Sequence, residues 1–228
     1  MDRVRQLFRR NNRKIKISPH YETKVCFITA IYGNKNASCK KYMKQTAPTD
    51  FICFTDNPRI ISNGWIIDTT PYQDTQKFYK QSFRQIPRLQ NYDIIVWLDS
   101  TVEIVYDRTS EYLLEKLPAA QIIWDEQSRS IQEIDSHYKM YVDEGYSEDF
   151  FNDMRIHTEY RGIWITHFIA YANKDPDVIQ LLDMWSSQET HEQIGFHYAA
   201  WKMRITPRLL PSRLVKGMKT QFYVLHEV

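Results

Sequence analysis

Glycine, cysteine and long apolar runs are scarce in this 228-residue sequence, which has 6 glycines and 3 cysteines. Neither the G-x-G-x-x-G fingerprint nor the P-loop pattern occurs, so a bound nucleotide is not held by either motif. The odd number of cysteines, without metal-ligand spacing, argues against a disulfide framework or a cysteine-based metal site. Cys26 and Cys53 lie inside apolar runs and are expected to be buried thiols, which predicts a reducing, cytoplasmic location.

An excess of one charge is also missing, because 30 Lys and Arg residues against 28 Asp and Glu residues give a net charge of +2. This balance argues against general nucleic-acid binding. No stretch is long and apolar enough to span a membrane. The basic start of the chain is not followed by the apolar run of a secretory signal.

Basic residues do gather at the start of the chain, where residues 1–16 hold seven of them and one acid. We expect a basic N-terminal arm over residues 1–20, followed by a single domain over residues 21–228. The arm either makes peripheral contact with a membrane surface or another anionic partner, or is a solvated chain end.

Short apolar runs closed by turn residues predict the strands. The run DIIVWLD (93–99) is the strongest, and it is typical of a central strand covered on both faces. The predicted strands lie at 24–33, 51–56, 64–68, 93–99, 121–124 and 162–172.

Helical patterns alternate with these runs through the first half of the chain, and residues 35–49 are polar and helix-compatible. The alternation predicts an α/β fold with a central, mainly parallel sheet flanked by helices. Residues 203–228 are expected to be a Pro- and Gly-punctuated tail. Helices are predicted at 75–86 (with Asp74 as a cap), from Ser110 to about 117, and at 130–144, 147–159, 176–185 and 191–202.

Asp99 follows the strongest predicted strand, in the run Trp97-Leu98-Asp99-Ser100-Thr101. Open α/β sheets bind ligands at the carboxyl ends of their strands. A carboxylate there suits a divalent cation, which would neutralise a diphosphate leaving group. The simpler interpretation is that Asp99 only caps a turn.

A cationic helix face precedes that strand, because Lys77, Lys80 and Arg84 are spaced by three, four and seven residues. Positive charge beside a strand-end carboxylate suits a metal-diphosphate group. The simpler interpretation is an exposed charged surface.

Two further candidates lie near the end of the chain. Glu192 and Gln193 begin the predicted helix 191–202. A carboxylate there suits a general base that activates an acceptor hydroxyl, or it only complements the helix dipole. His226 would be a ligand for a Mn²⁺-like ion if the tail folds over the site, and otherwise belongs to a loose chain end.

Several of these pieces carry a resemblance to a known family. Over roughly residues 24–215 the sequence resembles the GT-A-like glycosyltransferase family that includes the plant mucilage-related glycosyltransferase-like proteins, with bacterial and viral relatives. The resemblance implies a GT-A (nucleotide-diphospho-sugar transferase) fold and a UDP-sugar donor. The matching blocks are ITAIYGN (28–34), FICFTDN (51–57), Lys80 and Arg84 before IVWLDS (95–100), THFIAYANKDPDVIQLLDMW (166–185) and HEQIGFHYAAWK (191–202).

The resemblance also implies roles for particular residues. Lys80 would approach the phosphates, Asp99 would stand in the position of the metal-binding acid, and Gln193 matches a late Gln of the family. The nucleotide would lie near Tyr32, Gly33, Asn34, Thr55 and Asp56.

Two blocks depart from the pattern. The paired Asp-x-Asp of many GT-A enzymes is Asp99-Ser100-Thr101 here, so one carboxylate is missing, and the late Arg-Asp-Gln is His191-Glu192-Gln193. We expect Mn²⁺ or Mg²⁺ on Asp99, with His226 as a second ligand, and Lys80 and Arg84 as added positive charge.

The leading hypothesis is therefore metal-assisted transfer of a sugar to a glycan, lipid or protein acceptor. Glu192 would be the base if the anomeric centre is inverted, and would orient the donor sugar if it is retained. Two other functions stay open. The missing acid motivates a degenerate, non-catalytic nucleotide- or carbohydrate-binding module. A metal-dependent hydrolase would need clustered ligands, but the seven histidines are scattered.

Overall fold

The computed structural model describes most of the chain from residue 25 onward. The basic arm, Asn34, the proposed cap Asp74 and the helices predicted at 130–144 and 147–159 lie outside the described residues. The described ranges are 25–33, 38–73, 76–117, 122–124, 166–187, 192–205, 208–209 and 222–226.

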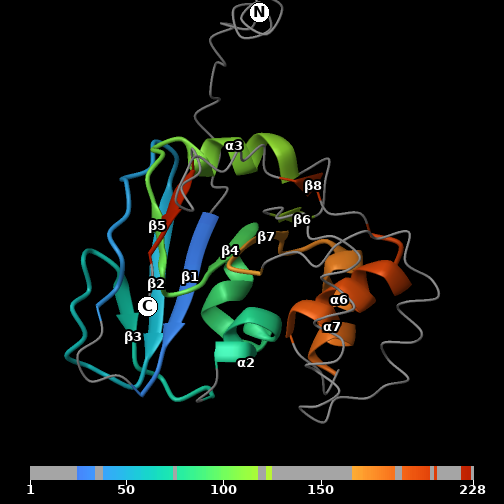
Figure 1. Cartoon of the computed structure of the whole chain (residues 1–228), viewed down its shortest axis with the longest axis horizontal. Helices are drawn as coiled ribbons and strands as arrows, with labels where there is room; N and C mark the ends of the chain where they lie inside the picture. Colours follow the sequence, from blue (N-terminus) through green and yellow to red (C-terminus); the bar gives the residue numbers. More distant parts are fainter. Residues whose placement is uncertain are drawn as a thin grey trace, which may run out of the picture.

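A seven-stranded sheet with the order β3-β2-β1-β4-β7-β6-β8 forms the centre of the described structure (Figure 1). Strand β1 is parallel to both of its neighbours, and β2 to β3 and β6 to β8 are also parallel, whereas β7 runs antiparallel to β4 and β6. The predicted α/β fold with a mainly parallel sheet is thus confirmed. The strands are β1 (Val25–Ile31), β2 (Thr49–Thr55), β3 (Ile66–Asp68), β4 (Ile94–Leu98), β6 (Ile122–Trp124), β7 (Phe168–Ala172) and β8 (Arg208–Leu209).

A second, two-stranded sheet joins β5 (Val102–Ile104) to β9 (Tyr223–Leu225) in antiparallel register. The prediction of an irregular tail over residues 203–228 was therefore wrong, because the tail contributes β8 and β9. Strands of two or three residues carry no readable alternation. They exist here because of partners far away in the sequence.

Helices cover both faces of the sheet. The prediction of one helix over 75–86 was wrong in its second half: α2 ends at Gln81, and two 3₁₀ helices follow. Ile86 is extended, as residues before a proline tend to be. The helices are α2 (Gln76–Gln81), η1 (Phe83–Gln85), η2 (Pro87–Asn91), α3 (Thr109–Lys116), α6 (Pro176–Ser186) and α7 (Glu192–Lys202).

Two smaller expectations also need correction. Ser110 does not cap α3: Arg108 takes the N-cap position, and the Ser110 hydroxyl accepts a hydrogen bond from Thr49 Oγ1 at 2.8 Å. The described part of the helix-compatible segment 35–49 is not helical. It forms β-bridges from Ser38 to Ile61 and from Tyr42 to Ile104.

The hydrophobic core has two halves, one on each face of the sheet. Strand β1 shows the division, because Cys26, Ile28 and Ala30 pack in the half that includes residues of α2, α6 and α7. Phe27 and Ile31 pack in the other half, with residues of β5, α3 and β9. Burial on both faces accounts for the continuous apolar run of this strand.

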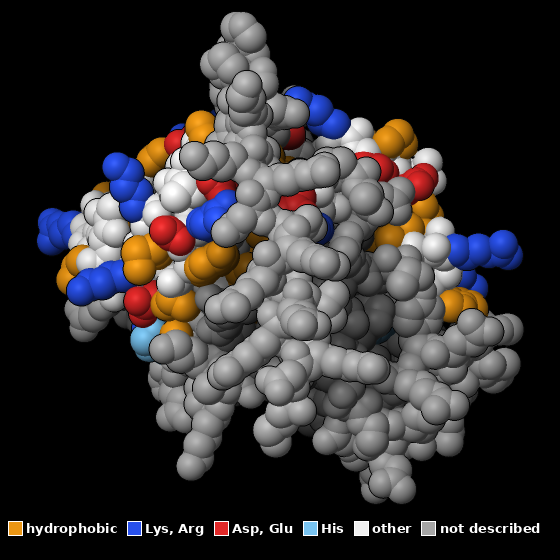
Figure 2. Space-filling model, turned by 90° about the horizontal axis from the view of Figure 1, so that it is seen from above, with side chains coloured by type: hydrophobic (Ala, Val, Ile, Leu, Met, Phe, Trp, Pro, Cys, Tyr) orange, Lys and Arg blue, Asp and Glu red, His pale blue; other side chains and the backbone are white. Residues whose placement is uncertain are grey.

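The surface agrees with the balanced composition. Seen from above, the described part of the molecule mixes basic, acidic and hydrophobic side chains (Figure 2). None of the described helices is long and apolar enough to cross a membrane.

Candidate active site

The sheet order places a topological switch between β1 and β4. The connection from β1 leads to β2 on one side, whereas β4 pairs with β1 on the other side. In open α/β sheets, ligands bind outside the carboxyl ends of the strands at such a point. Tyr32 and Gly33 follow β1, and Asp99 follows β4, so three of the predicted site residues flank the switch.

Asp99 is held in place by two donors on one oxygen. Trp97 Nε1 donates to Oδ1 at 2.7 Å, and Lys80 Nζ donates to the same oxygen at 3.3 Å. The backbone N–H of Asp99 donates to the carbonyl of His167 at 2.9 Å. The side chain of Asp99 is still 39% exposed. The carboxylate is therefore oriented by the protein and remains open to a ligand.

Lys80 is a buried lysine, with a side chain that is 2% exposed. Its ammonium also donates to Thr166 Oγ1 at 2.8 Å and lies 5.5 Å from the centre of the Trp97 ring. Burying an ammonium is costly unless it is paired and hydrogen-bonded. Asp99, Thr166 and the indole face supply this compensation from β4 and from the segment before β7.

A turn at the carboxyl ends of β1 and β2 holds other predicted residues together. The backbone N–H of Gly33, at φ +72°, donates to both carboxylate oxygens of Asp56, at 3.2 and 3.3 Å. Thr55 is buried, and its hydroxyl accepts from the N–H of Asn57 at 3.0 Å. Asp56 thus fixes the exit of β1, and glycine suits the left-handed conformation there.

Tyr32 links the end of β1 to helix α2. Its hydroxyl is hydrogen-bonded to that of Tyr79, and the two rings stack with centres 5.6 Å apart. The Tyr79 hydroxyl also donates to the carbonyl of Gln73 at 2.8 Å. Burial, followed by the bond to Tyr79, raises the pKa of Tyr32 above its ordinary value. The Tyr32 phenol therefore stays neutral, and its bond to Tyr79 joins the end of β1 to α2.

Arg84 lies at the other end of β4. Its Nη1 donates to the carbonyl of Asn173 at 2.5 Å, and the N–H of Asn173 in turn donates to the carbonyl of Asp93, just before β4. The shared cationic face is therefore not formed by Lys80 and Arg84. The α-helix ends at Gln81, so the spacing of four residues no longer brings side chains to one side.

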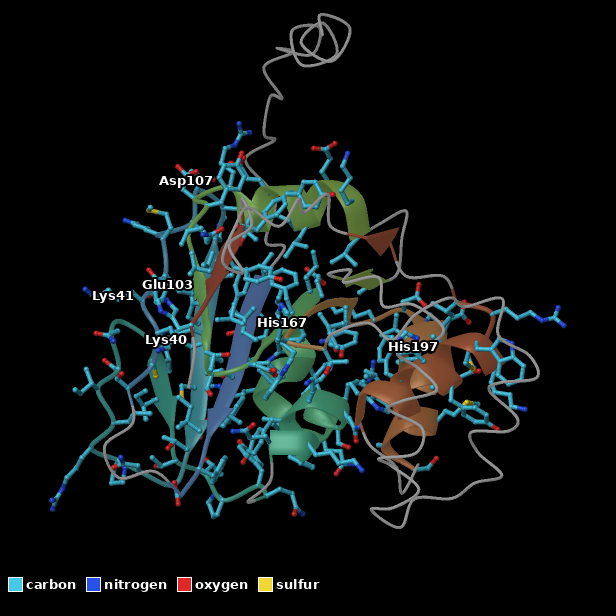
Figure 3. The ribbon with its side chains drawn as sticks, in the orientation of Figure 1. Lys40, Lys41, Glu103, Asp107, His167 and His197 are labelled. Carbon is cyan, nitrogen blue, oxygen red and sulfur yellow. The ribbon has the colours of Figure 1, made fainter. Side chains whose placement is uncertain are left out.

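His226 belongs to the small sheet. Its Nε2 is hydrogen-bonded to Glu103 Oε2 at 2.7 Å, and its backbone N–H donates to Thr101 at 3.0 Å. Figure 3 labels Glu103, which lies in β5. The tail does return to the loop that follows Asp99, but the His226 imidazole bonds to Glu103 and not to the Asp99 carboxylate.

Glu192 and Gln193 are the first residues of α7. Their side chains, like Asn34, lie outside what the structure describes. Further along α7, Phe196 is buried and packs edge-on against Trp185 of α6, with ring centres 4.8 Å apart. This contact anchors the helix that begins with Glu192.

The divalent cation expected at Asp99 from the sequence stays a prediction. Oδ1 already accepts from two N–H donors, one of them an ammonium. Among the described residues, no group of three or more His, Cys, Asp and Glu side chains is arranged to hold a metal ion. Mn²⁺ and Mg²⁺ need several oxygen ligands, and the described donors at Asp99 supply one carboxylate.

Sequence reasoning missed two partners of this site. The backbone of His167 and the hydroxyl of Thr166 lie just before β7, and Thr166 is 86 residues from Lys80 in the sequence. No spacing rule relates such positions. A surface hollow of about 690 Å³ lies elsewhere, lined by residues such as Tyr42, Lys44 and Asn63, and none of the predicted site residues borders it.

Comparison with known proteins supports the fold. No protein-family model and no curated protein matches the sequence. Among solved structures, the chain is similar to WbbM, a bifunctional glycosyltransferase solved in its apo form. The match has a TM-score of 0.50 at 10% identity and covers 86% of this chain and 40% of WbbM. The chain thus spans well under half of that protein, and the likeness shows an α/β, GT-A-like fold.

Proposed function

We propose that this chain transfers a sugar from a UDP-sugar to a hydroxyl group of a glycan, lipid-linked or protein acceptor. One observation carries the proposal: α2 ties together the two strand ends that flank the switch point of a GT-A-like sheet. Tyr79 bonds to Tyr32 after β1, and Lys80 bonds to Asp99 after β4. The sequence blocks that resemble the plant mucilage-related family support the same class of enzyme.

In the proposed reaction, the bond between the anomeric carbon and the β-phosphate oxygen breaks. The nucleoside diphosphate leaves with the electron pair. The acceptor oxygen forms the new bond to the anomeric carbon, and its proton passes to a base. We assign that base to Glu192 if the configuration is inverted, with Gln193 beside it. If the configuration is retained, Glu192 orients the donor sugar.

The nucleotide is proposed to lie over the turn formed by Gly33 and Asp56, with Tyr32, Asn34 and Thr55 around it. The two hydrogen bonds from Gly33 to Asp56 preorganise this turn. A preorganised protein site loses less conformational entropy when its ligand binds. All three cysteines are buried free thiols, which supports a cytoplasmic location for this activity.

The test is UDP binding by calorimetry, followed by turnover with a panel of UDP-hexoses and UDP-pentoses. Asp99→Asn is compared with Asp93→Asn, an acid at the opposite end of the same strand that pairs with Lys174. We expect the wild type and Asp93→Asn to turn over a donor alike, and Asp99→Asn to be slower by about 100-fold, as when one charged contact to the reacting group is lost.

Equal turnover in Asp99→Asn and the wild type would remove Asp99 from the mechanism. UDP binding without turnover of any donor would favour the non-catalytic binding module instead. Stoichiometric zinc in the purified protein, with no UDP binding, would favour the hydrolase.

A further inference from the structure

We propose that Glu103 and His226 are positioning residues for Asp99. Their side-chain hydrogen bond fastens β9 to the segment after Asp99, and this segment places the carboxylate at the proposed donor site. The inference deepens the proposed function and rests on it for the meaning of the site. Its physical content, the dependence of the Asp99 side chain on the contact between Glu103 and His226, can be measured without any turnover.

The first argument is the backbone that carries Asp99. Residues 99–102 form a tight turn, in which the N–H of Val102 donates to the carbonyl of Asp99 at 2.9 Å. The N–H of Asp99 itself donates to the carbonyl of His167 at 2.9 Å. The backbone of Asp99 is thus fixed both to β5, through Val102, and to the segment before β7, so the position of its carboxylate follows that of the turn.

The second argument is that β9 and the residue after it support both ends of this turn. At the end of the turn, the N–H of His226 donates to the carbonyl of Thr101 at 3.0 Å. At its start, the His167 that accepts from Asp99 is hydrogen-bonded through Nε2 to the Tyr223 hydroxyl at 2.6 Å. A shift of β9 would therefore reach Asp99 along two routes.

The third argument is that the contact between Glu103 and His226 joins two very short strands. Strands β5 and β9 have three residues each, and a two-stranded sheet is marginally stable by itself. Glu103 pairs with Val224, so His226 is its diagonal neighbour, and its Nε2 lies 2.7 Å from Glu103 Oε2. Such cross-strand contacts stabilise small sheets. The two side chains are 30% and 39% exposed, so the contact can be removed without opening a cavity in the core.

The first measurement follows Trp97, whose indole N–H donates to Asp99 Oδ1 at 2.7 Å. In protein labelled with nitrogen-15 at tryptophan, the NMR signal of this N–H reports the position of the carboxylate, and Trp97→Phe assigns it. We expect Glu103→Ala and His226→Ala to shift the signal in the direction seen for Asp99→Asn. The matched control is Glu111→Ala, which removes an acid of similar exposure, 23%, from α3 and should leave the signal unchanged.

The second measurement compares donor turnover with UDP affinity. Glu103→Ala and His226→Ala should turn over the donor about tenfold more slowly, because a misplacement of about 1 Å costs up to about 100-fold in rate. Their affinity for UDP should change less than about twofold, since the nucleotide is proposed to lie over the turn of Gly33 and Asp56. Glu103→Gln can still bond to the imidazole and should keep most of the wild-type turnover.

An unchanged Trp97 signal in both alanine variants would overturn the proposal, as would an equal shift in Glu111→Ala. Slow turnover in His226→Ala alone, with Glu103→Ala like the wild type, would also overturn it, because His226 then acts without Glu103, as the metal ligand expected from the sequence would. If one alanine variant fails to fold, the other tests the same bond from its opposite side. If no donor is turned over, the proposed function fails, and the Trp97 signal still tests this inference.

Discussion

Two ion pairs of the same residue types lie at the two ends of β4, and they differ in burial. The side chains of Lys80 and Asp99 are 2% and 39% exposed, whereas those of Lys174 and Asp93 are 63% and 36% exposed. An exposed pair contributes little to stability, but a buried ammonium that loses its counter-charge is costly. The two pairs should therefore respond differently to the same substitutions.

We predict that Asp99→Asn lowers the free energy of unfolding by about 2–3 kcal/mol, because it removes a carboxylate that pairs with the buried Lys80 ammonium. Lys80→Met should cost less than Asp99→Asn, since it leaves a carboxylate that water can reach. The double variant Lys80→Met/Asp99→Asn should recover part of the loss. Urea unfolding followed by circular dichroism measures all three.

The matched controls are Asp93→Asn and Lys174→Met, which should change the free energy of unfolding by less than about 1 kcal/mol. If Asp99→Asn proves no more costly than Asp93→Asn, the Lys80 ammonium is not buried as described. The comparison also separates loss of folding from loss of activity in the turnover experiment.

The sequence indicated that Asp99 and Lys80 belong to a charged site, but it did not indicate all of the residues that they contact. Asp99 could be found because a strong apolar run ends on it, and Lys80 because a family block contains it. Arg84 could not be separated from Lys80, because the change from α-helix to 3₁₀ helix after Gln81 has no clear signature in the sequence. Thr166 meets Lys80 only through the folding of the sheet.

Among the elements, helix α6 shows a start that the sequence predicts well. Asp175 caps it by accepting from the backbone N–H groups of Asp177 and Val178, at 2.9 and 3.3 Å, and Pro176 occupies the first turn. We predict that Asp175→Ala lowers the free energy of unfolding by about 1 kcal/mol and that Asp175→Ser restores most of it. Asp183→Ala, in the same helix, is the control in urea unfolding and should have a smaller effect than Asp175→Ala.

The edge strand β3 is tied to η2 by a charged contact. Arg88 Nη1 donates to Asp68 Oδ2 at 2.7 Å. Burial raises the pKa of Asp68, but the hydrogen bonds from Thr70 and the pairing with Arg88 outweigh it, so the pKa of this carboxyl lies below its usual value of 3.8.

This shift predicts a pH-dependent contribution to stability. A carboxyl whose pKa is lowered by folding stabilises the native state above its unfolded pKa, and the contribution is lost as the pH falls through the folded pKa. Asp68→Asn should therefore cost about 1–2 kcal/mol at neutral pH, the scale of a lost charged hydrogen bond. The difference from the wild type should shrink below a pH of about 4. Urea unfolding of both proteins across this range measures it, and a difference that does not change with pH would contradict the prediction.

The long strands and helices could be predicted from the sequence, whereas the shortest strands could not. Strands β1, β2 and β4 bury most of their residues, so their apolar runs mark them. Helices α6 and α7 keep their predicted positions to within one residue. Strands β5, β8 and β9 have three, two and three residues, and their existence depends on their partners. Tertiary contacts, not local pattern, decide such segments.

On the scale of the whole molecule, pairing between distant short strands makes residues 222–225 part of the folded core. Strand β9 pairs with β5, and His226 meets Glu103, 123 residues away in the sequence. Phe222 and Tyr223 are 0% and 1% exposed. The small sheet that follows Asp99 is therefore completed only when the chain returns from its far end.

Tyr223 of β9 joins the small sheet to the main sheet through two contacts. Its ring stacks on Phe168 of β7, with centres 5.7 Å apart and an angle of 15° between the planes, and its hydroxyl is hydrogen-bonded to His167 Nε2 at 2.6 Å. We predict that Tyr223→Ala lowers the free energy of unfolding by about 3–5 kcal/mol, the range for a buried aromatic cut to alanine. Tyr223→Phe keeps the ring and should cost about 1–2 kcal/mol through the lost hydrogen bond. Val224→Ala, at the next position of β9 and only half-buried, is the control and should cost less than Tyr223→Ala. If Tyr223→Ala and Val224→Ala unfold at the same urea concentration, β9 does not pack on the core in solution, and the loop after Asp99 is held by other contacts.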